Sequence, residues 1–376
     1  MIEGRKDWRN LIEVDMKQNA SPIIWFHCAS LGEFEQGRPI IDSVKSTLPE
    51  YKIFLTFYSP SGYEVRKHYH NADYVHYLPW DTSPAMRDLY QMVTPKMLII
   101  IKYEFWSHLI RHGADIRIPV IVCSSLFRER QIFFKPWGGF FRGIVKHLSH
   151  IYVQDQKSAT LLTNMGIESV TVAGDTRVDR VATIIQNPES NPIVEQFLQG
   201  KRAFIIGSSW SQDISILAPF INEHQEIKFI IAPHETNESQ LDHLYAQIKR
   251  PMVRYTQYVQ DISTDILIID TIGLLSHIYQ YGRYAYIGGA FGKGLHNILE
   301  PAAFGLPLFF GRKNYVKFSE AVTLVESGGA FAIANTKELE NAFFEVSNNE
   351  NSYNEASKSC HDYIRRNRGA TELLLN

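Results

Sequence analysis

Short runs of apolar, largely β-branched and aromatic residues recur along the chain, separated by segments long enough to form helices. Six runs occur in the first half, at 22–29, 51–57, 96–101, 118–124, 150–154 and 169–174. Six more occur in the second half, at 202–209, 228–233, 265–270, 283–289, 306–311 and 329–334. Continuous apolar runs of this length are typical of central strands in a parallel sheet, which are buried on both faces. The pattern predicts an α/β protein with two parallel sheets in series.

The segment "IIQNPESNPIVEQF" at 184–197 separates the two sets of runs. It carries two prolines and several polar residues, which are typical of a linker. We therefore expect an N-terminal domain at 1–183, a linker at 184–200 and a second domain at 201–355. A length of 376 residues fits two domains, since a domain has roughly 150 residues.

The composition is that of an ordinary globular protein, with 45% hydrophobic and 21% charged residues and a formal net charge of -2. This balance gives no reason to expect nucleic acid as a partner, so any anion site must be local. The cysteines Cys28, Cys123 and Cys360 are too few and too dispersed for a disulfide framework or a cysteine zinc site, which favours the cytoplasm. The chain has no apolar run of the roughly 18 to 20 residues that a spanning helix needs, and its first ten residues lack the pattern of a signal peptide.

The first apolar strand runs directly into "SLGEFEQG", with Glu33 at the joint. Ligands of open α/β sheets bind beyond the carboxyl ends of the strands, where a carboxylate is well placed to act as a general base. Gly32 would let a ligand approach the backbone closely. The same residues also form the capping-box pattern Ser30-x-x-Glu33, in which Glu33 only caps a helix. The stretch alone leaves both interpretations open.

A second candidate site lies in "YIGGAFGKGLHNILEPAAFGLPLFFG", at 286–311. A strand ends in two glycines, passes through a glycine-rich loop and enters a helix near His296 or Asn297. Such a turn presents unpaired backbone N–H groups and the positive end of the helix dipole, which favours a phosphate. Glu300 could accept hydrogen bonds from a ribose diol, although an acidic first-turn residue also stabilises a helix dipole without any ligand.

A third candidate site lies in "IIGSSWSQD", at 205–213, where a strand again leads into a helix. Ser208 and Ser209 are residue types that cap helices, and their N–H groups would face a phosphate. A cap without a ligand remains the alternative.

Five stretches occur in one order over nearly the whole chain: "FHCASLGEFEQGRPII", "YEFWSHL", "VAGDTRVDR", "GSSWSQD" and "GGAFGKGLHNILEPAAFGLPLFFG". Together they resemble the 3-deoxy-D-manno-octulosonic acid (Kdo) transferases of lipopolysaccharide assembly, glycosyltransferase family 30. The resemblance implies a GT-B fold, with two Rossmann-like parallel-sheet domains facing each other across a cleft. It also implies inverting transfer of Kdo from CMP-Kdo to a hydroxyl of the lipid A precursor lipid IVA, with no metal or cofactor and with Glu33 as the catalytic base.

The resemblance assigns further roles, with two departures from the family pattern. In "IKYEFWSHL" only Glu104 carries over from an acidic pair, and we expect it beside Glu33, near the acceptor or supporting Glu33. In "IAPHETNE" the family arginine is absent and His234 remains, so Lys293, Arg312 or Lys313 would share its contacts. The expected donor-binding residues are Ser208, Ser209, His234, Gly292, Lys293, Gly294, His296, Asn297 and Glu300.

Acceptor recognition is assigned to the segment 126–148, which interleaves basic and aromatic residues. Such a segment suits an anionic lipid interface, because the charges meet phosphates and the rings enter the headgroup region. A solvated loop beside a core helix is the alternative, and the neighbouring sequence has no RNA-binding motif. The expected acceptor-binding residues are Ser30, Gly32, Arg128, Arg130, Lys135 and Trp137.

Family members commonly begin with an apolar membrane anchor, which this chain lacks. An anchor that was removed and a peripheral protein that uses the 126–148 segment both remain open, with the cytoplasmic face of the inner membrane as the expected location. In a GT-B fold the C-terminal segment 356–376 would be a helix that packs back on the first domain.

Two other functions remain as alternatives. One is a GT-B transferase or epimerase that uses a UDP-sugar, and the other is a non-catalytic nucleotide- or lipid-binding module in which Glu33 only caps a helix. A nicotinamide dehydrogenase is disfavoured, because no G-x-G-x-x-G motif follows the first strand.

Overall fold

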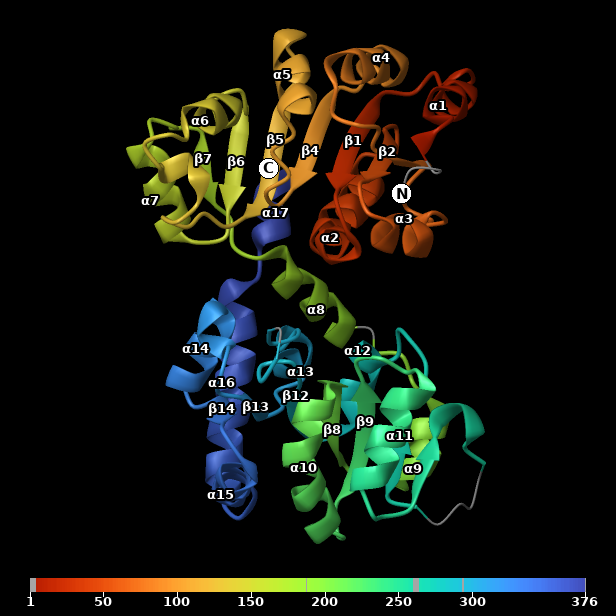
Figure 1. Cartoon of the computed structure of the whole chain (residues 1–376), viewed down its shortest axis with the longest axis vertical. Coiled ribbons are helices and arrows are strands. Elements are labelled where there is room, and N and C mark those ends of the chain that lie inside the picture. The colour runs from red at the N-terminus through yellow and green to blue at the C-terminus, as the bar shows by residue number, and fades with distance from the viewer. Residues whose placement is uncertain (1–4, 187, 260–263, 293, 376) are drawn as a thin grey trace. The chain divides into compact units, whose positions relative to one another are not determined.

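The computed structural model describes residues 5–186, 188–259, 264–292 and 294–375. The chain divides into two compact units, each with its own sheet (Figure 1). The first comprises Met1–Arg180 and Asn367–Asn376, and the second comprises Val181–Arg366. Each unit is described separately below.

The first unit is built on a parallel sheet of seven strands in the order β3-β2-β1-β4-β5-β6-β7. Its strands are β1 (Ile23–Cys28), β2 (Lys52–Phe57), β3 (Tyr74–Tyr77), β4 (Met97–Ile101), β5 (Val120–Ser125), β6 (His150–Val153) and β7 (Val170–Val172). Every residue of β1 is buried, including His27, which explains why its other residues are apolar.

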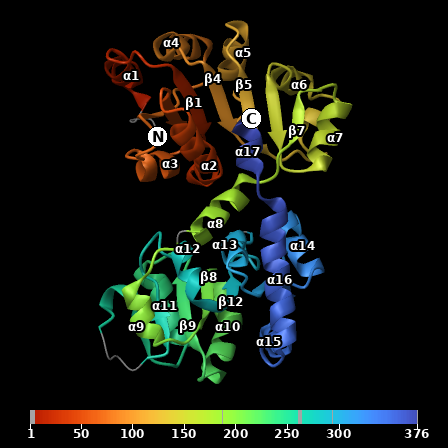
Figure 2. The ribbon, with the colours of Figure 1, turned by 180° about the vertical axis from the view of Figure 1, so that it is seen from behind.

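Helices cover both faces of this sheet. They are α1 (Trp8–Met16), α2 (Leu31–Thr47), α3 (Pro60–Arg66), α4 (Ser83–Val93), α5 (Ser107–Asp115), α6 (Gly139–Val145), α7 (Gln156–Asn164), the first part of α8 (Thr176–Gln186) and α17 (Ala370–Leu375). One face packs Trp25 and its neighbours against α1, α4, α5, α6 and α7, and the other packs Phe26 and its neighbours against α2. The C-terminal α17 lies beside α2, as both views of the ribbon show (Figure 1, Figure 2).

The second unit has its own seven-stranded parallel sheet, in the order β10-β11-β9-β8-β12-β13-β14. Its strands are β8 (Ala203–Ser209), β9 (Lys228–Pro233), β10 (Met252–Arg254), β11 (Ile266–Ile268), β12 (Gly282–Ile287), β13 (Leu308–Gly311) and β14 (Ala330–Ile333). Its helices are the rest of α8, α9 (Pro192–Leu198), α10 (Ser211–Glu223), α11 (Glu238–Gln247), α12 (Leu275–Ile278), α13 (Leu299–Ala303), α14 (Ser319–Glu326), α15 (Thr336–Ser347) and nearly all of α16 (Glu350–Asn367). One core packs Phe204 and Ile206 of β8 against α10, α11 and α15.

The predicted α/β class is confirmed, and each of the twelve predicted runs forms a strand. Two further strands, β3 and β10, were not predicted. Both are edge strands, since each stands first in its sheet order. They are short, and none of the first three residues of β3 is fully buried, so neither forms a continuous apolar run.

The unit boundaries differ from the predicted domain boundaries. The 184–200 segment is not a separate linker, because it contains the end of α8 and all of α9, and it belongs to the second unit. Val194 and Phe197 of α9 are buried, which explains this assignment. The predicted C-terminal helix is also divided, since α16 buries Cys360 and Ile364 in the second unit and only 367–376 returns to the first.

No helix in the described part of the chain is both long enough and apolar enough to cross a membrane.

Candidate active site

Each sheet has a point where the connections change direction, and the candidate residues gather there. In the first unit β1 lies between β2 and β4, and in the second unit β8 lies between β9 and β12. Open α/β sheets bind ligands beyond the carboxyl ends of strands at such points. Glu33 and Glu104 follow β1 and β4, and the segments 207–213 and 288–298 follow β8 and β12.

Glu33 forms the capping box that its sequence pattern predicts. Helix α2 begins at Leu31 with Ser30 as its N-cap. The Ser30 backbone N–H and its hydroxyl both donate to Glu33 Oε2, at 2.8 and 2.9 Å. Within the described residues, Glu33 Oε1 accepts no hydrogen bond. The carboxylate therefore caps the helix with one oxygen and keeps the other available.

Glu104 lies close enough to Glu33 for their charges to interact. Burial and, to a smaller extent, the Glu33 carboxylate raise the pKa of Glu104 to about 7, and the Trp106 indole opposes the rise. A carboxyl group with a pKa near neutrality can exchange protons under physiological conditions. The fold thus brings the two predicted catalytic residues together at one sheet edge.

Two arginines also act on Tyr103, which lies beside Glu104 in the sequence. Burial raises the pKa of the Tyr103 phenol, the charges of Arg128 and Arg177 oppose that rise, and Glu33 and Asp175 support it. Arg177 forms a fork on Asp175, with its Nε 2.9 Å and its Nη2 2.6 Å from Oδ2. The sequence analysis assigned no role to Arg177 or Asp175, although both lie in the matched stretch 172–180.

Gly32 is exposed on the first turn of α2. A Cβ atom added there would come near only one neighbouring group, the Ser30 hydroxyl at 3.9 Å. The surface around Gly32 is therefore open, as close approach of a ligand requires.

The 126–148 segment divides into a buried part and an exposed part. Phe127 and Phe133 belong to the core of the first unit, so they cannot enter a lipid interface as the prediction for this segment assumed. Trp137 and Phe140 have exposed fractions of 74% and 56%. The physical reason is that the segment forms a short 3-10 helix, residues 132–134, followed by α6. These two helical segments direct some of the rings toward the core and others toward solvent.

The cations of this segment also divide. Arg128 and Arg130 are exposed, and Lys135 is half-buried. Arg142 instead stabilises the segment itself, since its Nη1 donates to the carbonyl oxygens of Phe133 and Lys135 at 3.1 and 2.7 Å. Arg128, Arg130 and Trp137 remain available to an acceptor surface.

In the second unit, the turn after β8 differs from the predicted cap. The N-cap of α10 is Trp210, and Ser208 and Ser209 belong to the end of β8. Ser208 adopts a left-handed φ of 51°, an unfavourable conformation for a side chain with a Cβ. The buried Ser209 hydroxyl has no hydrogen-bond partner among the described residues. A buried hydroxyl without a partner is costly, so a bound polar ligand would satisfy it.

Asp213 holds together the two loops that follow β8 and β12. It is fully buried, and its Oδ2 accepts the backbone N–H groups of Trp210 and Gly289 at 2.9 and 3.0 Å. The Tyr286 hydroxyl donates to Oδ1 at 2.8 Å. Burial raises the pKa of Asp213. A side chain at Gly288 would come within 2.3 Å of the Ser208 carbonyl oxygen, so this close packing requires glycine.

The 288–298 loop differs from the predicted phosphate seat. Helix α13 begins at Leu299, not near His296 or Asn297, and it has only five residues. The N–H groups of Gly292 and Gly294 donate to the Gly289 carbonyl at 3.0 and 3.1 Å. The loop therefore uses these donors for its own turn, and they are not free for a phosphate. Lys293 lies outside the described residues.

Asn297 and Glu300 contact each other at the end of this loop. Asn297 Nδ2 donates to Glu300 Oε1 at 3.1 Å, and Asn297 Oδ1 accepts the Leu299 N–H at 3.1 Å. Burial raises the pKa of the Tyr279 phenol, and the Glu300 charge adds to the rise. The predicted ribose contact therefore has a fixed position between Asn297 and Tyr279.

Three aromatic rings meet at the carboxyl edge of this sheet. The Trp210 Nε1–H donates to His296 Nε2 at 2.8 Å. The His234 ring stacks against both, with centroids 4.3 Å from Trp210 and 4.4 Å from His296. The predicted residues His234 and His296 are thus brought together. Arg312, by contrast, pairs with Glu338 at 2.6 Å.

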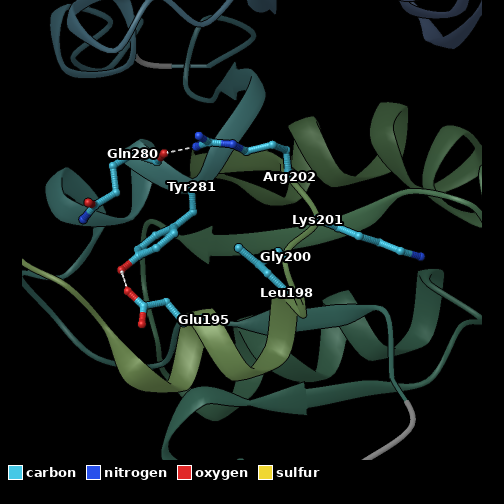
Figure 3. Close-up of a pocket in the computed structure, with 7 residues that line it drawn as sticks. All are labelled: Glu195, Leu198, Gly200, Lys201, Arg202, Gln280 and Tyr281. Carbon is cyan, nitrogen blue, oxygen red and sulfur yellow. Dashed lines mark hydrogen bonds between the residues drawn. The ribbon is translucent and has the colours of Figure 1, made fainter.

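A separate pocket of about 380 Å³ lies at the opposite, amino-terminal edge of this sheet (Figure 3). Arg202 donates to the Gln280 carbonyl and Tyr281 to Glu195 Oε1, while Lys201 extends away from the other side chains. The two cations therefore do not converge. Among the described residues, no group of three or more His, Cys, Asp or Glu side chains is placed to hold a metal ion.

Comparison with known proteins finds similarity to one family. Residues 6–180 match the family model described as 3-Deoxy-D-manno-octulosonic-acid transferase (kdotransferase). Over this part the chain is similar to the Kdo transferases. The Kdo transferase of Aquifex aeolicus is 24% identical over 329 residues, covering 86% of this chain and 85% of that protein. The enzyme of Haemophilus influenzae is 23% identical over 366 residues, covering 94% and 86%.

Solved structures extend the likeness to the fold. The UDP-GlcNAc 2-epimerase of Neisseria meningitidis superposes with a TM-score of 0.69 at 13% identity, covering 94% of this chain and 98% of that chain. MurG of Acinetobacter baumannii superposes with a TM-score of 0.56 at 10% identity, covering 94% and 98%. At this identity the likeness concerns the fold alone. Together with the two parallel sheets, it confirms that the chain has the GT-B fold.

Proposed function

We propose that the protein is an inverting glycosyltransferase that moves Kdo from CMP-Kdo to a hydroxyl of a lipid A precursor such as lipid IVA. Similarity to Kdo transferases over most of the chain supports the sugar and the reaction class. The observation that carries the mechanism is Glu33, whose carboxylate lies at the carboxyl edge of the first sheet with one oxygen available.

In this proposal Glu33 Oε1 takes the proton of the acceptor hydroxyl. The acceptor oxygen then forms a bond to the anomeric carbon of Kdo, and the bond from that carbon to the CMP phosphate oxygen breaks. The electron pair leaves with the phosphate, which departs as CMP. One base is sufficient for a single inverting displacement. Glu104 supports the base from the same sheet edge.

The second unit would hold the donor. The buried Ser209 hydroxyl and the His296 ring offer hydrogen bonds to the phosphate or the Kdo carboxylate, and Glu300 accepts from the ribose. Fixed donors can stabilise a developing negative charge. In this proposal the hydrogen-bond donors of the second unit act without a metal ion or cofactor.

The acceptor would be met by the exposed part of the 126–148 segment. Arg128 and Arg130 provide charges for the phosphates of the acceptor, and Trp137 provides an exposed ring for the headgroup region. The proposal includes a location at the cytoplasmic face of the inner membrane, to which the protein would attach as a peripheral enzyme.

The test is Kdo transfer from CMP-Kdo to tetraacylated lipid A precursor with EDTA present, comparing the wild type with Glu33→Gln. Loss of a general base lowers the rate roughly 10²- to 10⁴-fold. Glu50→Gln is the control, because Glu50 is an exposed carboxylate outside the site. Equal rates for wild type and Glu33→Gln would show that Glu33 caps the helix and is not the base. Wild type without product would contradict the Kdo assignment.

Donor competition separates the UDP-sugar alternative. We expect CMP, and not UDP, to inhibit transfer. Stronger inhibition by UDP would favour a UDP-sugar enzyme. Binding of either nucleotide without turnover of any sugar donor would favour a binding module.

A further inference from the structure

Trp210, to which the proposed chemistry gives no role, forms a pair with His296. Their rings lie within 11° of parallel with centroids 6.2 Å apart, and the hydrogen bond of 2.8 Å joins their edges. The pair is therefore close to coplanar. His234 stacks on it at interplanar angles of 24° to Trp210 and 28° to His296.

Three adjacent strands fix the positions of these rings. His234 follows β9, Trp210 follows β8, and His296 lies in the loop after β12. The His234 N–H donates to the Ser209 carbonyl at 2.9 Å, and the His296 N–H donates to the Gly288 carbonyl at 3.2 Å. Asp213 fixes the backbone at Trp210 and Gly289, as described above. The ring pair therefore has little freedom to rearrange.

The bond between the rings determines which nitrogen of His296 carries the proton. An indole N–H is a donor only, so His296 Nε2 must offer a lone pair. The single ring proton of neutral His296 then lies on Nδ1. A protonated ring would place an N–H against the Trp210 N–H and break the bond. Burial and, to a smaller extent, the charge of the neighbouring His234 lower the pKa of His296 to about 4.

We propose that Trp210 is a positioning residue that holds His296 as the neutral Nδ1–H tautomer, a fixed hydrogen-bond donor for an anionic group of the nucleotide-sugar donor. The role toward the donor rests on the function proposed above. The anionic group is a phosphate or a sugar carboxylate. Among the described residues, His234 is the titratable group that faces His296, by stacking and through its charge. The Asp213 oxygens are occupied by Trp210, Gly289 and Tyr286.

The experiment is ¹⁵N NMR of the full chain labelled at histidine, with the His296 signal assigned by its loss in His296→Gln. In the wild type we expect Nδ1 protonated and Nε2 unprotonated from about pH 8 down to about pH 5. A wild-type spectrum with the proton on Nε2 would overturn the proposal without any variant at Trp210.

The variant Trp210→Phe keeps an aromatic ring and removes the indole N–H. In this variant we expect His296 to be a mixture of both tautomers and to take up a proton at higher pH than in the wild type. The affinity for CMP, measured by calorimetry, should fall on the order of tenfold. Trp80→Phe makes the same chemical change in the first unit and should leave the spectrum and CMP binding unchanged. If Trp210→Phe keeps the Nδ1–H tautomer and full CMP affinity, the proposal is wrong.

Two results separate this proposal from the proposed function. Loss of the tautomer in Trp210→Phe, together with wild-type protein that binds CMP but transfers no Kdo, would support the positioning role and reject Kdo transfer. Kdo transfer that is unaffected in Trp210→Phe, with the tautomer unchanged, would reject the positioning role alone.

Discussion

Both hydrogen-bond donors of Ser30 converge on one oxygen of Glu33, at 2.8 Å from the backbone nitrogen and 2.9 Å from the hydroxyl. One carboxylate can therefore serve both as a helix cap and as a general base, because the two roles use different oxygens. The cap and the base are separable by mutation, since the cap needs an acceptor atom and the base needs a negative charge.

Glu33→Gln and Glu33→Ala should separate the two roles. Glutamine retains an acceptor oxygen for Ser30, so its free energy of unfolding should stay close to that of the wild type. Alanine removes the acceptor and should destabilise the first unit by about 1 kcal/mol. Both should lose Kdo transfer by roughly 10²- to 10⁴-fold. Urea unfolding and initial rates measure the two effects, and a Glu33→Ala variant that keeps the wild-type rate would argue against the base.

Stability should fall with rising pH through Glu104. Its folded pKa is raised from 4.5 to about 7, so between these values the folded state binds a proton that the unfolded state has lost. The free energy of unfolding therefore decreases as the pH rises through this window and levels off above it. Glu104→Gln should flatten this dependence in urea unfolding at about pH 5 and about pH 8. An unchanged pH dependence in Glu104→Gln would assign the effect to other groups.

Glu33 should be detectable in the titration of Glu104. Because the Glu33 carboxylate raises the pKa of Glu104, Glu33→Gln should lower that pKa. The measurement is a ¹³C NMR titration of labelled glutamate side chains, with the Glu104 signal assigned by Glu104→Gln. An identical Glu104 titration in both proteins would show that the two carboxylates do not interact.

Gly32→Ala should stabilise the fold and impair the reaction. Alanine favours a helix over glycine by up to about 1 kcal/mol, and the open space around Gly32 accepts a methyl group. The same methyl group would obstruct an acceptor that approaches the backbone, so KM for the acceptor should rise while the melting temperature increases. A more stable variant with unchanged KM would remove Gly32 from the acceptor site.

The central strands were predictable because they are buried on both faces. The runs that contain Trp25 and Phe204 carry a signal that survives without structural information, since interior strands admit few polar residues. The edge strand at 74–77 carries no such signal, because Tyr74 and His76 are only half-buried. Capping at Ser30 was also predictable, since it depends on local spacing.

The interior of the candidate site in the second unit was not predictable, because it depends on contacts between distant segments. Asp213 joins Trp210 to Gly289, and Gly289 lies 76 residues after Asp213 in the sequence. The sequence after β8 was compatible with a helix cap at Ser208 or Ser209, whereas the structure has the cap at Trp210. Nor does spacing reveal that the Gly292 and Gly294 N–H groups are used within the loop, since that depends on its backbone path.

Asp213→Ala should destabilise the second unit more than the removal of any one group that donates a hydrogen bond to Asp213. It leaves two backbone N–H groups and the Tyr286 hydroxyl without an acceptor, which costs about 2 to 5 kcal/mol in total. Tyr286→Phe should cost only about 1 kcal/mol. Asp242→Asn, at an exposed position, is the control. Calorimetric unfolding measures these effects, and a loss for Asp213→Ala no greater than for Tyr286→Phe would show that water replaces the carboxylate.

Trp137→Ser and Phe140→Ser should weaken binding to vesicles that contain anionic lipid. Both side chains are exposed, at 74% and 56%, so their removal leaves the core of the first unit intact. Each should lower the partition coefficient roughly tenfold, because burying an aromatic side chain contributes about 1.5 to 3 kcal/mol when complete. Phe344→Ser is the matched control, since Phe344 has an exposed fraction of 68% but lies on α15 of the second unit.

The charges of the same surface should act in a different way. Arg128→Gln with Arg130→Gln should reduce binding to anionic vesicles at low salt and have little effect at high salt, because exposed charges are screened over about 10 Å at 0.1 M salt. The aromatic variants should lose binding at both salt concentrations, because the hydrophobic contribution is not screened. Sedimentation with vesicles of fixed anionic content measures both. Equal partitioning of Phe344→Ser and Trp137→Ser would contradict the assignment of this surface, since the two variants remove similar exposed apolar area from different units.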